Sequence, residues 1–109
     1  MTDKPPHSPQ TQEELTAHFN AQTARLAWPE LVRHFARGVV VKVTPELDLV
    51  AVAVAMAQDR ADAIETWTQA GQLQRASDDD ARDWHEQESA FWAVVVAPWV
   101  LVQEITEIK

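Results

Sequence analysis

The chain has 109 residues, which is enough for one folded domain and too few for two domains with separate cores. Its formal net charge is −8, and this acidic balance disfavours non-specific binding to nucleic acid or to an anionic membrane surface. It contains no cysteine, so disulfides, thiol chemistry and cysteine-ligated zinc are excluded.

The first ten residues predict a disordered tail that precedes a single folded domain over residues 11–109. They are polar, contain three prolines and lack the apolar core of a signal peptide. The apolar run at residues 90–102 is thirteen residues long, fewer than the roughly 20 that a membrane-spanning helix needs. We therefore expect a cytoplasmic protein that does not enter a membrane.

Two helices are predicted in the first third of the chain. Thr11 followed by Glu14 is a capping box, and apolar residues at helical spacing continue to Leu26. Pro29 suits the first turn of a second helix, and Gly38 stands where its C-terminal cap is expected. The buried stripe expected on this second helix consists of Leu31, Val32, Phe35 and Ala36.

The next segments contain one clear strand and one ambiguous element. Residues 39–43 are rich in valine and predict a strand. Thr44, Pro45 and Glu46 then repeat the chemistry of a helix start. Residues 49–57 alternate valine with alanine, as a strand would, but their alanine content and the preceding start signal favour a buried helix. We predict the helix, and a strand is the alternative.

A fourth and a fifth helix are predicted around a short strand. Asp59 is a candidate cap for the fourth helix, which should end at Gly71. Residues 72–76 predict the strand. Ser77 is expected to cap the fifth helix, whose first turn contains three aspartates that suit the positive end of the helix dipole.

The apolar run at residues 90–102 is the most informative segment for both fold and function. A strand sends side chains to two faces, so an unbroken apolar run requires burial on both. Pro98 predicts a bend or bulge, because proline cannot donate to a sheet ladder. The sequence therefore predicts an α+β domain, with about five helices packed on a small, mainly antiparallel sheet. Its strands are expected near 39–43, 72–76, 91–97 and 99–105.

Four blocks of sequence together resemble one bacterial family. They are Trp28-Pro29-Glu30-Leu31, His34-Phe35-Ala36-Arg37-Gly38, Leu47-Asp48-Leu49-Val50, and the long block FWAVVVAPWVLVQE at 91–104. On these blocks the chain resembles the domain of unknown function 2288 over about residues 13–105. The resemblance implies a compact, stand-alone bacterial domain. It implies no activity, substrate, cofactor or catalytic residue.

The first hypothesis of function is a non-enzymatic protein-interaction module, homodimeric through the C-terminal apolar segment. One small core does not easily cover thirteen consecutive apolar residues, and exposed apolar patches mark interfaces. Tryptophan is also enriched among interface anchors. The interface candidates are Trp92, Trp99 and Leu101. Burial in the core is the alternative for the two tryptophans.

The second hypothesis is an enzyme or a small-ligand-binding protein, because the ends of buried strands often carry binding sites. The candidate ligand contacts are Arg33, His34, Arg37, Asp48, Gln103 and Glu104. The acidic residues at 78–88 lack the pattern of a calcium loop, the histidines lack metal-ligand spacing, and no glycine-rich phosphate loop is present. We therefore expect no metal, no cofactor and no nucleic acid, and we expect the partner to be a second copy or another protein.

Overall fold

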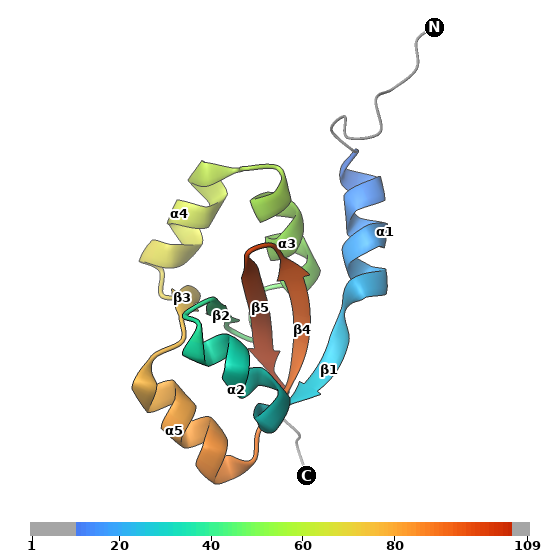
Figure 1. Cartoon of the computed structure of the whole chain (residues 1–109). Coiled ribbons are helices and arrows are strands. Elements are labelled where there is room, and N and C mark those ends of the chain that lie inside the picture. Colours follow the sequence, from blue (N-terminus) through green and yellow to red (C-terminus); the bar gives the residue numbers. More distant parts are fainter. Residues whose placement is uncertain (1–10, 106–109) are drawn as a thin grey trace, which may run out of the picture.

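Residues 11–105 are described by the computed structural model of this chain, and they form five helices and one five-stranded sheet (Figure 1). This arrangement confirms the predicted α+β class. The elements in chain order are α1 (Gln12–Gln22), β1 (Ala24–Ala27), α2 (Trp28–Ala36), β2 (Val40–Val43), α3 (Leu49–Ala57), α4 (Ala61–Gln69), β3 (Leu73–Arg75), α5 (Asp78–Gln87), β4 (Ala90–Val96) and β5 (Trp99–Glu104). The predicted tail at 1–10 and the end of the predicted domain at 106–109 lie outside the described residues.

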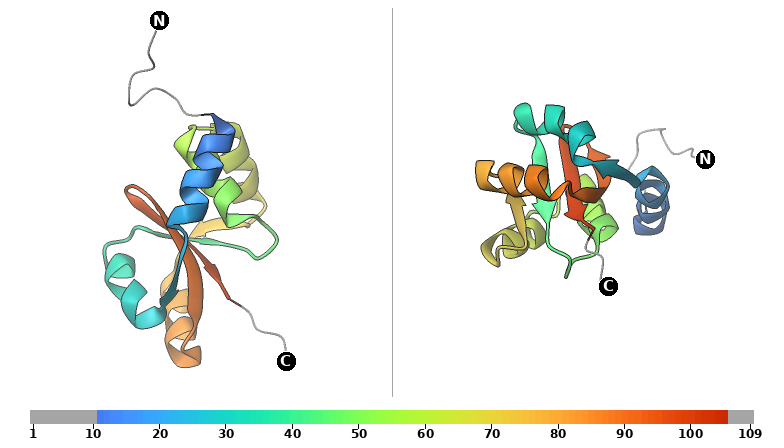
Figure 2. Two further views of the ribbon diagram at one scale, coloured as in Figure 1. Left: turned by 90° about the vertical axis from the view of Figure 1, so that its right-hand side faces the viewer. Right: turned by 90° about the horizontal axis from the view of Figure 1, so that it is seen from below.

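The sheet has the strand order β1-β4-β5-β2-β3. Only β2 and β5 run parallel, and the other three neighbouring pairs are antiparallel, so the predicted mainly antiparallel sheet is confirmed. Helices α1, α3 and α4 cover one face, which we call the α3 face (Figure 2). Helices α2 and α5 cover the opposite face, which we call the α2 face.

Each face of the sheet has its own hydrophobic core. Side chains alternate along the central strands, so Val94 and Leu101 are buried against the α3 face while Phe91 and Val100 are buried against the α2 face. Residues 49–57 form the predicted helix, and Val52 has no exposed surface. The apolar character of this helix on all sides follows from its position between the sheet, α1 and α4.

The local start and stop signals are confirmed at most helix ends. Thr11 with Glu14 and Ser77 with Asp80 form capping boxes. Gly38 follows α2 with a φ of 76°, a conformation in which glycine carries no steric penalty. Gly71 likewise follows α4 with a φ of 78°.

Two predicted helix starts are wrong. The start signal at residues 44–46 forms a turn, and α3 begins after Asp48, whose carboxylate accepts hydrogen bonds from the backbone N–H groups of Val50 and Ala51. Asp59 has a φ of 58° and does not cap α4, because the residue at the cap position is Arg60. Aspartate suits caps and turns alike, so its side chain alone does not distinguish the two.

The first helix is shorter than predicted, and β1 is an unpredicted strand. Helix α1 ends at Gln22, and Leu26 lies in β1 instead, where it is paired with Phe91. The sequence ARLA has no strand signal of its own, so pairing with β4 determines its conformation. The buried stripe of α2 also differs from the expected one, because Val32 and Ala36 are exposed and Trp28, the first residue of the helix, is buried.

The C-terminal apolar run forms an antiparallel hairpin with a turn at Ala97-Pro98, which are joined by a cis peptide bond. Most of the body of the hairpin is covered on both faces, as an apolar run requires, and the exception is Trp92, which is 44% exposed. Its tip is less covered: Val95 is 58% exposed, and Val96 and Trp99 are half-buried. The single chain thus buries most of this segment but not its tip.

Candidate interaction surface

The six predicted ligand contacts do not come together in the structure. Arg33, His34 and Arg37 lie on α2 or at its C-terminal end, over the α2 face. Gln103 points to the opposite face of the sheet and toward the turn that precedes Asp48. The sheet therefore separates the α2 residues from Gln103, and no shared hydrogen-bonded site joins the two groups.

Three of these six residues have clear structural roles. The side-chain amide of Gln103 donates to the carbonyl oxygens of Thr44 and Leu47 at 2.8 and 2.7 Å and thereby holds the turn before α3. The carboxylate of Glu104 accepts a 2.8 Å hydrogen bond from the hydroxyl of Ser89, and Asp48 caps α3. These hydrogen bonds give all three polar side chains a structural role, so no ligand is needed to account for their positions.

Replacing Gln103 by alanine is expected to lower the free energy of unfolding by about 1–2 kcal/mol, because two backbone carbonyls lose their donor. Urea unfolding of the variant and of the parent protein measures the change. The matched control is Gln22→Ala, since Gln22 is exposed at the end of α1 and lies outside the described cavities. A Gln103 variant no less stable than the Gln22 variant would contradict the role assigned to Gln103.

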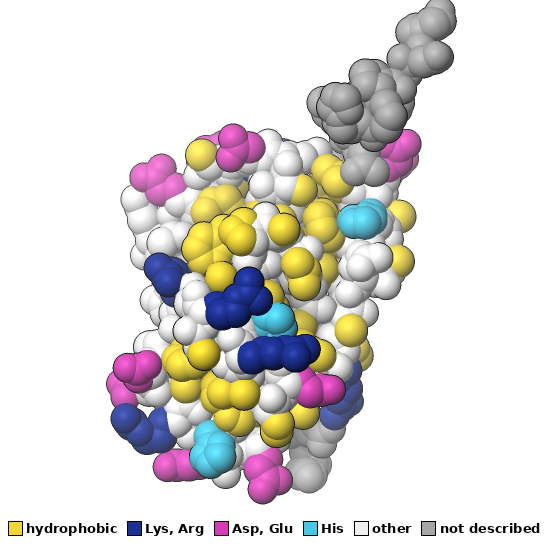
Figure 3. All heavy atoms as spheres, in the orientation of Figure 1, with side chains coloured by type: hydrophobic (Ala, Val, Ile, Leu, Met, Phe, Trp, Pro, Cys, Tyr) yellow, Lys and Arg dark blue, Asp and Glu magenta, His cyan; other side chains and the backbone are white. Residues whose placement is uncertain are grey.

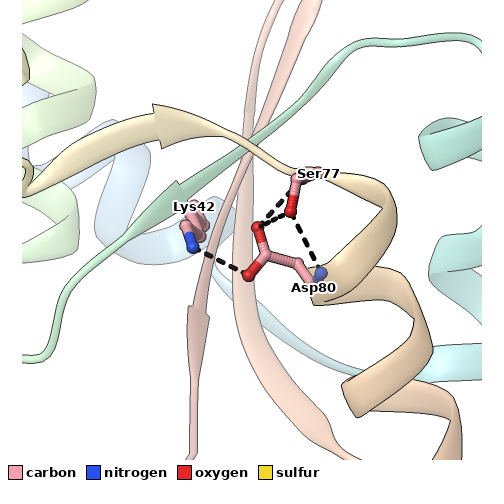
Figure 4. Close-up of polar contacts among 3 residues, drawn as sticks. All are labelled: Lys42, Ser77 and Asp80. Atoms are coloured by element: carbon pink, nitrogen blue, oxygen red, sulfur yellow. Dashed lines mark hydrogen bonds and ion pairs between the residues drawn. The ribbon is translucent and has the colours of Figure 1, made fainter.

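A polar cluster that the sequence does not predict joins β2 to the start of α5 (Figure 4). Lys42 Nζ lies 2.8 Å from one carboxylate oxygen of Asp80, and the other oxygen accepts hydrogen bonds from the backbone N–H and the hydroxyl of Ser77. Burial raises the pKa of Asp80, but the hydrogen bonds from Lys42 and Ser77 outweigh it and hold the pKa below its ordinary value. Because each charge is already compensated, we interpret the cluster as a structural link.

An apolar groove lies between α4 and the tip of the β4–β5 hairpin. It consists of two adjoining hollows of about 540 and 530 Å³. Met56, Ile64 and Trp99 line both hollows and form the shared floor. We call this surface the hairpin groove. Its remaining lining residues are Val41, Thr68, Leu73, Gln74 and Arg75 in the first hollow, and Asp59, Ala61, Glu65, Val96, Ala97 and Pro98 in the second.

The three predicted interface residues have different surroundings. Trp99 is half-buried in the hairpin groove, and the guanidinium carbon of Arg75 lies 5.7 Å from the centre of its ring. Trp92 is 44% exposed but lies toward the other end of β4, paired with Arg25. Leu101 has no exposed surface, so its side chain belongs to the core and contributes nothing to an interface.

A family model described as "Protein of unknown function (DUF2288)" matches residues 14–104. The chain belongs to this family. The resemblance seen in the four sequence blocks is thereby confirmed. The comparison with curated proteins gives no match for this DUF2288 chain.

A solved structure supports the same assignment of fold. The NMR solution structure of the protein PA1075 from Pseudomonas aeruginosa is similar to the DUF2288 chain with a TM-score of 0.75 and 37% sequence identity. The similarity covers 97% of this chain and 95% of the other. This likeness extends to the whole architecture, and it names no activity for either protein.

Two further observations concern the described part of the DUF2288 chain. Within residues 11–105, no group of three or more histidine, aspartate or glutamate side chains is placed to hold a metal ion. None of the helices in the same range is long and apolar enough to cross a membrane.

Proposed function

We propose that this DUF2288 protein is a non-enzymatic protein-interaction module that forms a homodimer through the hairpin groove. The observation that carries the proposal is the apolar floor of Met56, Ile64 and Trp99, which the chain leaves open between α4 and the hairpin tip. In Figure 3 hydrophobic side chains gather on the upper part of the front face, in the region of α3, α4 and the hairpin. Contiguous apolar surface of this kind is typical of binding sites.

The chemistry of the groove suits a polypeptide partner. A half-buried tryptophan is a common anchor of protein interfaces, because its large ring can be covered at little entropic cost. Methionine adapts its shape to different contacts, and Met56 lines both hollows together with Trp99. Covering such apolar surface contributes roughly 25 cal/mol for each Å² removed from water.

The ligand-binding hypothesis lacks comparable support. Its six candidate residues are divided between two faces of the sheet, and three of them already hold a turn, a helix end or a neighbouring hydroxyl. A small-molecule site normally brings a few polar groups together in one apolar pocket. The hairpin groove instead offers a broad apolar floor with charges only at its rim, which favours a protein surface as its partner.

The experiment that tests the proposal is analytical ultracentrifugation, together with native mass spectrometry, of the purified full chain over a wide range of concentration. We expect a reversible monomer–dimer equilibrium. Ile64→Asp should yield a folded monomer over the same range, because it places a charge at the centre of the groove floor. Ile64→Ala, which removes apolar area without adding charge, should weaken the dimer less.

The matched control is Val32→Asp, since Val32 is an exposed aliphatic residue on α2 outside the groove lining. This variant should dimerise like the parent protein. Circular dichroism and urea unfolding show whether each variant is folded. A parent protein that stays monomeric at every concentration, or a folded Ile64→Asp variant that dimerises undiminished, would overturn the proposal.

A further inference from the structure

We propose that two copies pack their hairpin grooves about a two-fold axis, so that Arg75 of each copy faces Asp59 and Glu65 of the other. This inference rests on the proposed homodimer and adds its arrangement. The occupant of the groove is thus the same groove of a second chain. The residues that determine the arrangement are the charged residues at its two ends.

The hairpin groove has opposite charges at its ends. Arg75 lines only the first hollow, whereas Asp59 and Glu65 line only the second. The shared apolar floor lies between them. On the front face in Figure 3, carboxylate side chains lie at the top, Lys and Arg side chains lie near the middle, and hydrophobic side chains lie between them.

These end charges are available for a partner. Among the described residues the ion pairs are Lys42–Asp80 and Arg82–Asp79, so none of the groove's charged side chains belongs to an ion pair within residues 11–105. Asp59 and Glu65 are both exposed.

Arg75 is held in position at the rim of the groove. One terminal nitrogen donates a 2.8 Å hydrogen bond to the carbonyl of Gly38, and the guanidinium lies over the ring of Trp99. A guanidinium has five N–H donors, so most of them remain free to reach a carboxylate of another chain. Because the side chain is already ordered, an ion pair formed by it costs less conformational entropy than one formed by a freely moving arginine.

A two-fold axis is the symmetry that matches this polarity. In a two-fold dimer the same surface patch occurs on both sides, and each contact between two different residues occurs twice. The axis must lie in the plane of the interface, pass through the centre of the apolar floor and run perpendicular to the line joining the two ends. In that orientation it brings the cationic end of each groove to the acidic end of the other, and Trp99 of one copy near the partner's Trp99. A uniformly acidic or uniformly basic partner would complement only one end.

The arrangement is tested by reversing the charges at each end. Arg75→Glu makes both ends of the groove acidic, and the double variant Asp59→Asn with Glu65→Arg makes both ends basic. Asparagine is chosen at position 59 because it tolerates the positive φ there. We expect each variant alone to dimerise at least about tenfold more weakly than the parent protein, because like charges meet at both contacts.

Mixing the two variants should restore the dimer. The acidic copy and the basic copy complement each other at both contacts, so native mass spectrometry should show a one-to-one heterodimer, identified by its mass. Arg25→Glu is the control, because Arg25 lies on the edge strand opposite to β3. It should form homodimers like the parent protein and should not pair preferentially with the basic variant.

Arg75→Gln separates loss of the charge from reversal of the charge. Its homodimer should be weaker than that of the parent protein but stronger than that of Arg75→Glu.

The outcomes distinguish the arrangement from the proposed function. If the parent protein dimerises, Ile64→Asp does not, and the charge variants form homodimers as strongly as the parent, the two-fold arrangement is overturned and the groove remains the interface. A pair of weakened variants that fails to form a heterodimer overturns the arrangement as well. If the parent protein does not dimerise at all, the proposed homodimer fails, and the arrangement fails with it.

Discussion

Replacing Phe91 by alanine is expected to lower the free energy of unfolding by about 3–5 kcal/mol, the largest effect of any single change considered for this protein. Phe91 has no exposed surface and lies on β4, a central strand of the sheet. Its ring meets that of Trp84 edge to face, with centroids 4.9 Å apart, and Trp84 in turn contacts Trp28. Truncation would leave a cavity among rings that α5, α2 and β4 hold in place.

Urea unfolding measures this effect, and the matched control lies on the same strand and the same side of the sheet. Val95 is four residues from Phe91 and is 58% exposed, so Val95→Ala should change the unfolding free energy by less than about 0.5 kcal/mol. Similar losses in the two variants would show that the hairpin tip is covered in solution. That result would contradict the difference in burial between the body and the tip of the hairpin.

Replacing Asp80 by alanine is expected to cost about 2–3 kcal/mol at neutral pH, the second-largest effect. The variant loses the Ser77–Asp80 capping box and also leaves the Lys42 ammonium without its partner. Both losses loosen the junction between β2 and α5. The two residues that form this junction, Lys42 and Asp80, are thirty-eight positions apart in the sequence. Lys42→Met, which keeps the capping box, should cost less and so separates the two contributions.

The same cluster predicts how stability changes with pH. The folded state holds the pKa of Asp80 below the ordinary aspartate value of about 3.9, so the unfolded chain takes up a proton at this position first as the pH falls. The contribution of Asp80 is therefore fully present above about pH 5 and is lost as the pH falls through the ordinary value toward the lower folded one.

Unfolding free energies measured between roughly pH 7 and pH 2 for the parent protein and for Asp80→Asn test this dependence. The stability difference between the two proteins should shrink below about pH 4, because asparagine does not titrate. A difference that stays constant over the whole range would show that the Asp80 carboxylate is not preferentially ionised in the folded state.

The local signals in the sequence predicted the elements whose stability is local. The capping box at Thr11 and the capping serine at position 77 predicted the starts of α1 and α5, because a cap involves only residues about three positions apart. Residues 49–57 could be recognised as a helix from their alanine content, despite their strand-like alternation and although the expected start signal at residues 44–46 forms a turn. The thirteen-residue apolar run likewise located the centre of the sheet, since only a central strand buries both of its faces.

The candidate surface was predicted only in part. Trp99 is the single member of the hairpin groove among the sequence-predicted site residues. Ile64 has the spacing of an inward-facing helix residue, and that spacing is the same whether the helix packs against a core or against a partner. Arg75 and Asp59 carry no sequence signal for a site. Their proposed role in an interface depends on their positions at opposite ends of one groove, and the fold alone determines those positions.

The sequence by itself determined the class of the fold, the number of helices, the location of the core segment and the family. These properties depend on composition, on local hydrogen bonding and on the spacing of apolar residues. All three can be read from residues that are close together in the sequence. Only the tertiary structure decided that ARLA is a strand, that Leu101 is core while Trp99 borders a groove, and that Lys42 pairs with Asp80. Each of these depends on which distant segment packs against the residue, and no local pattern contains that information.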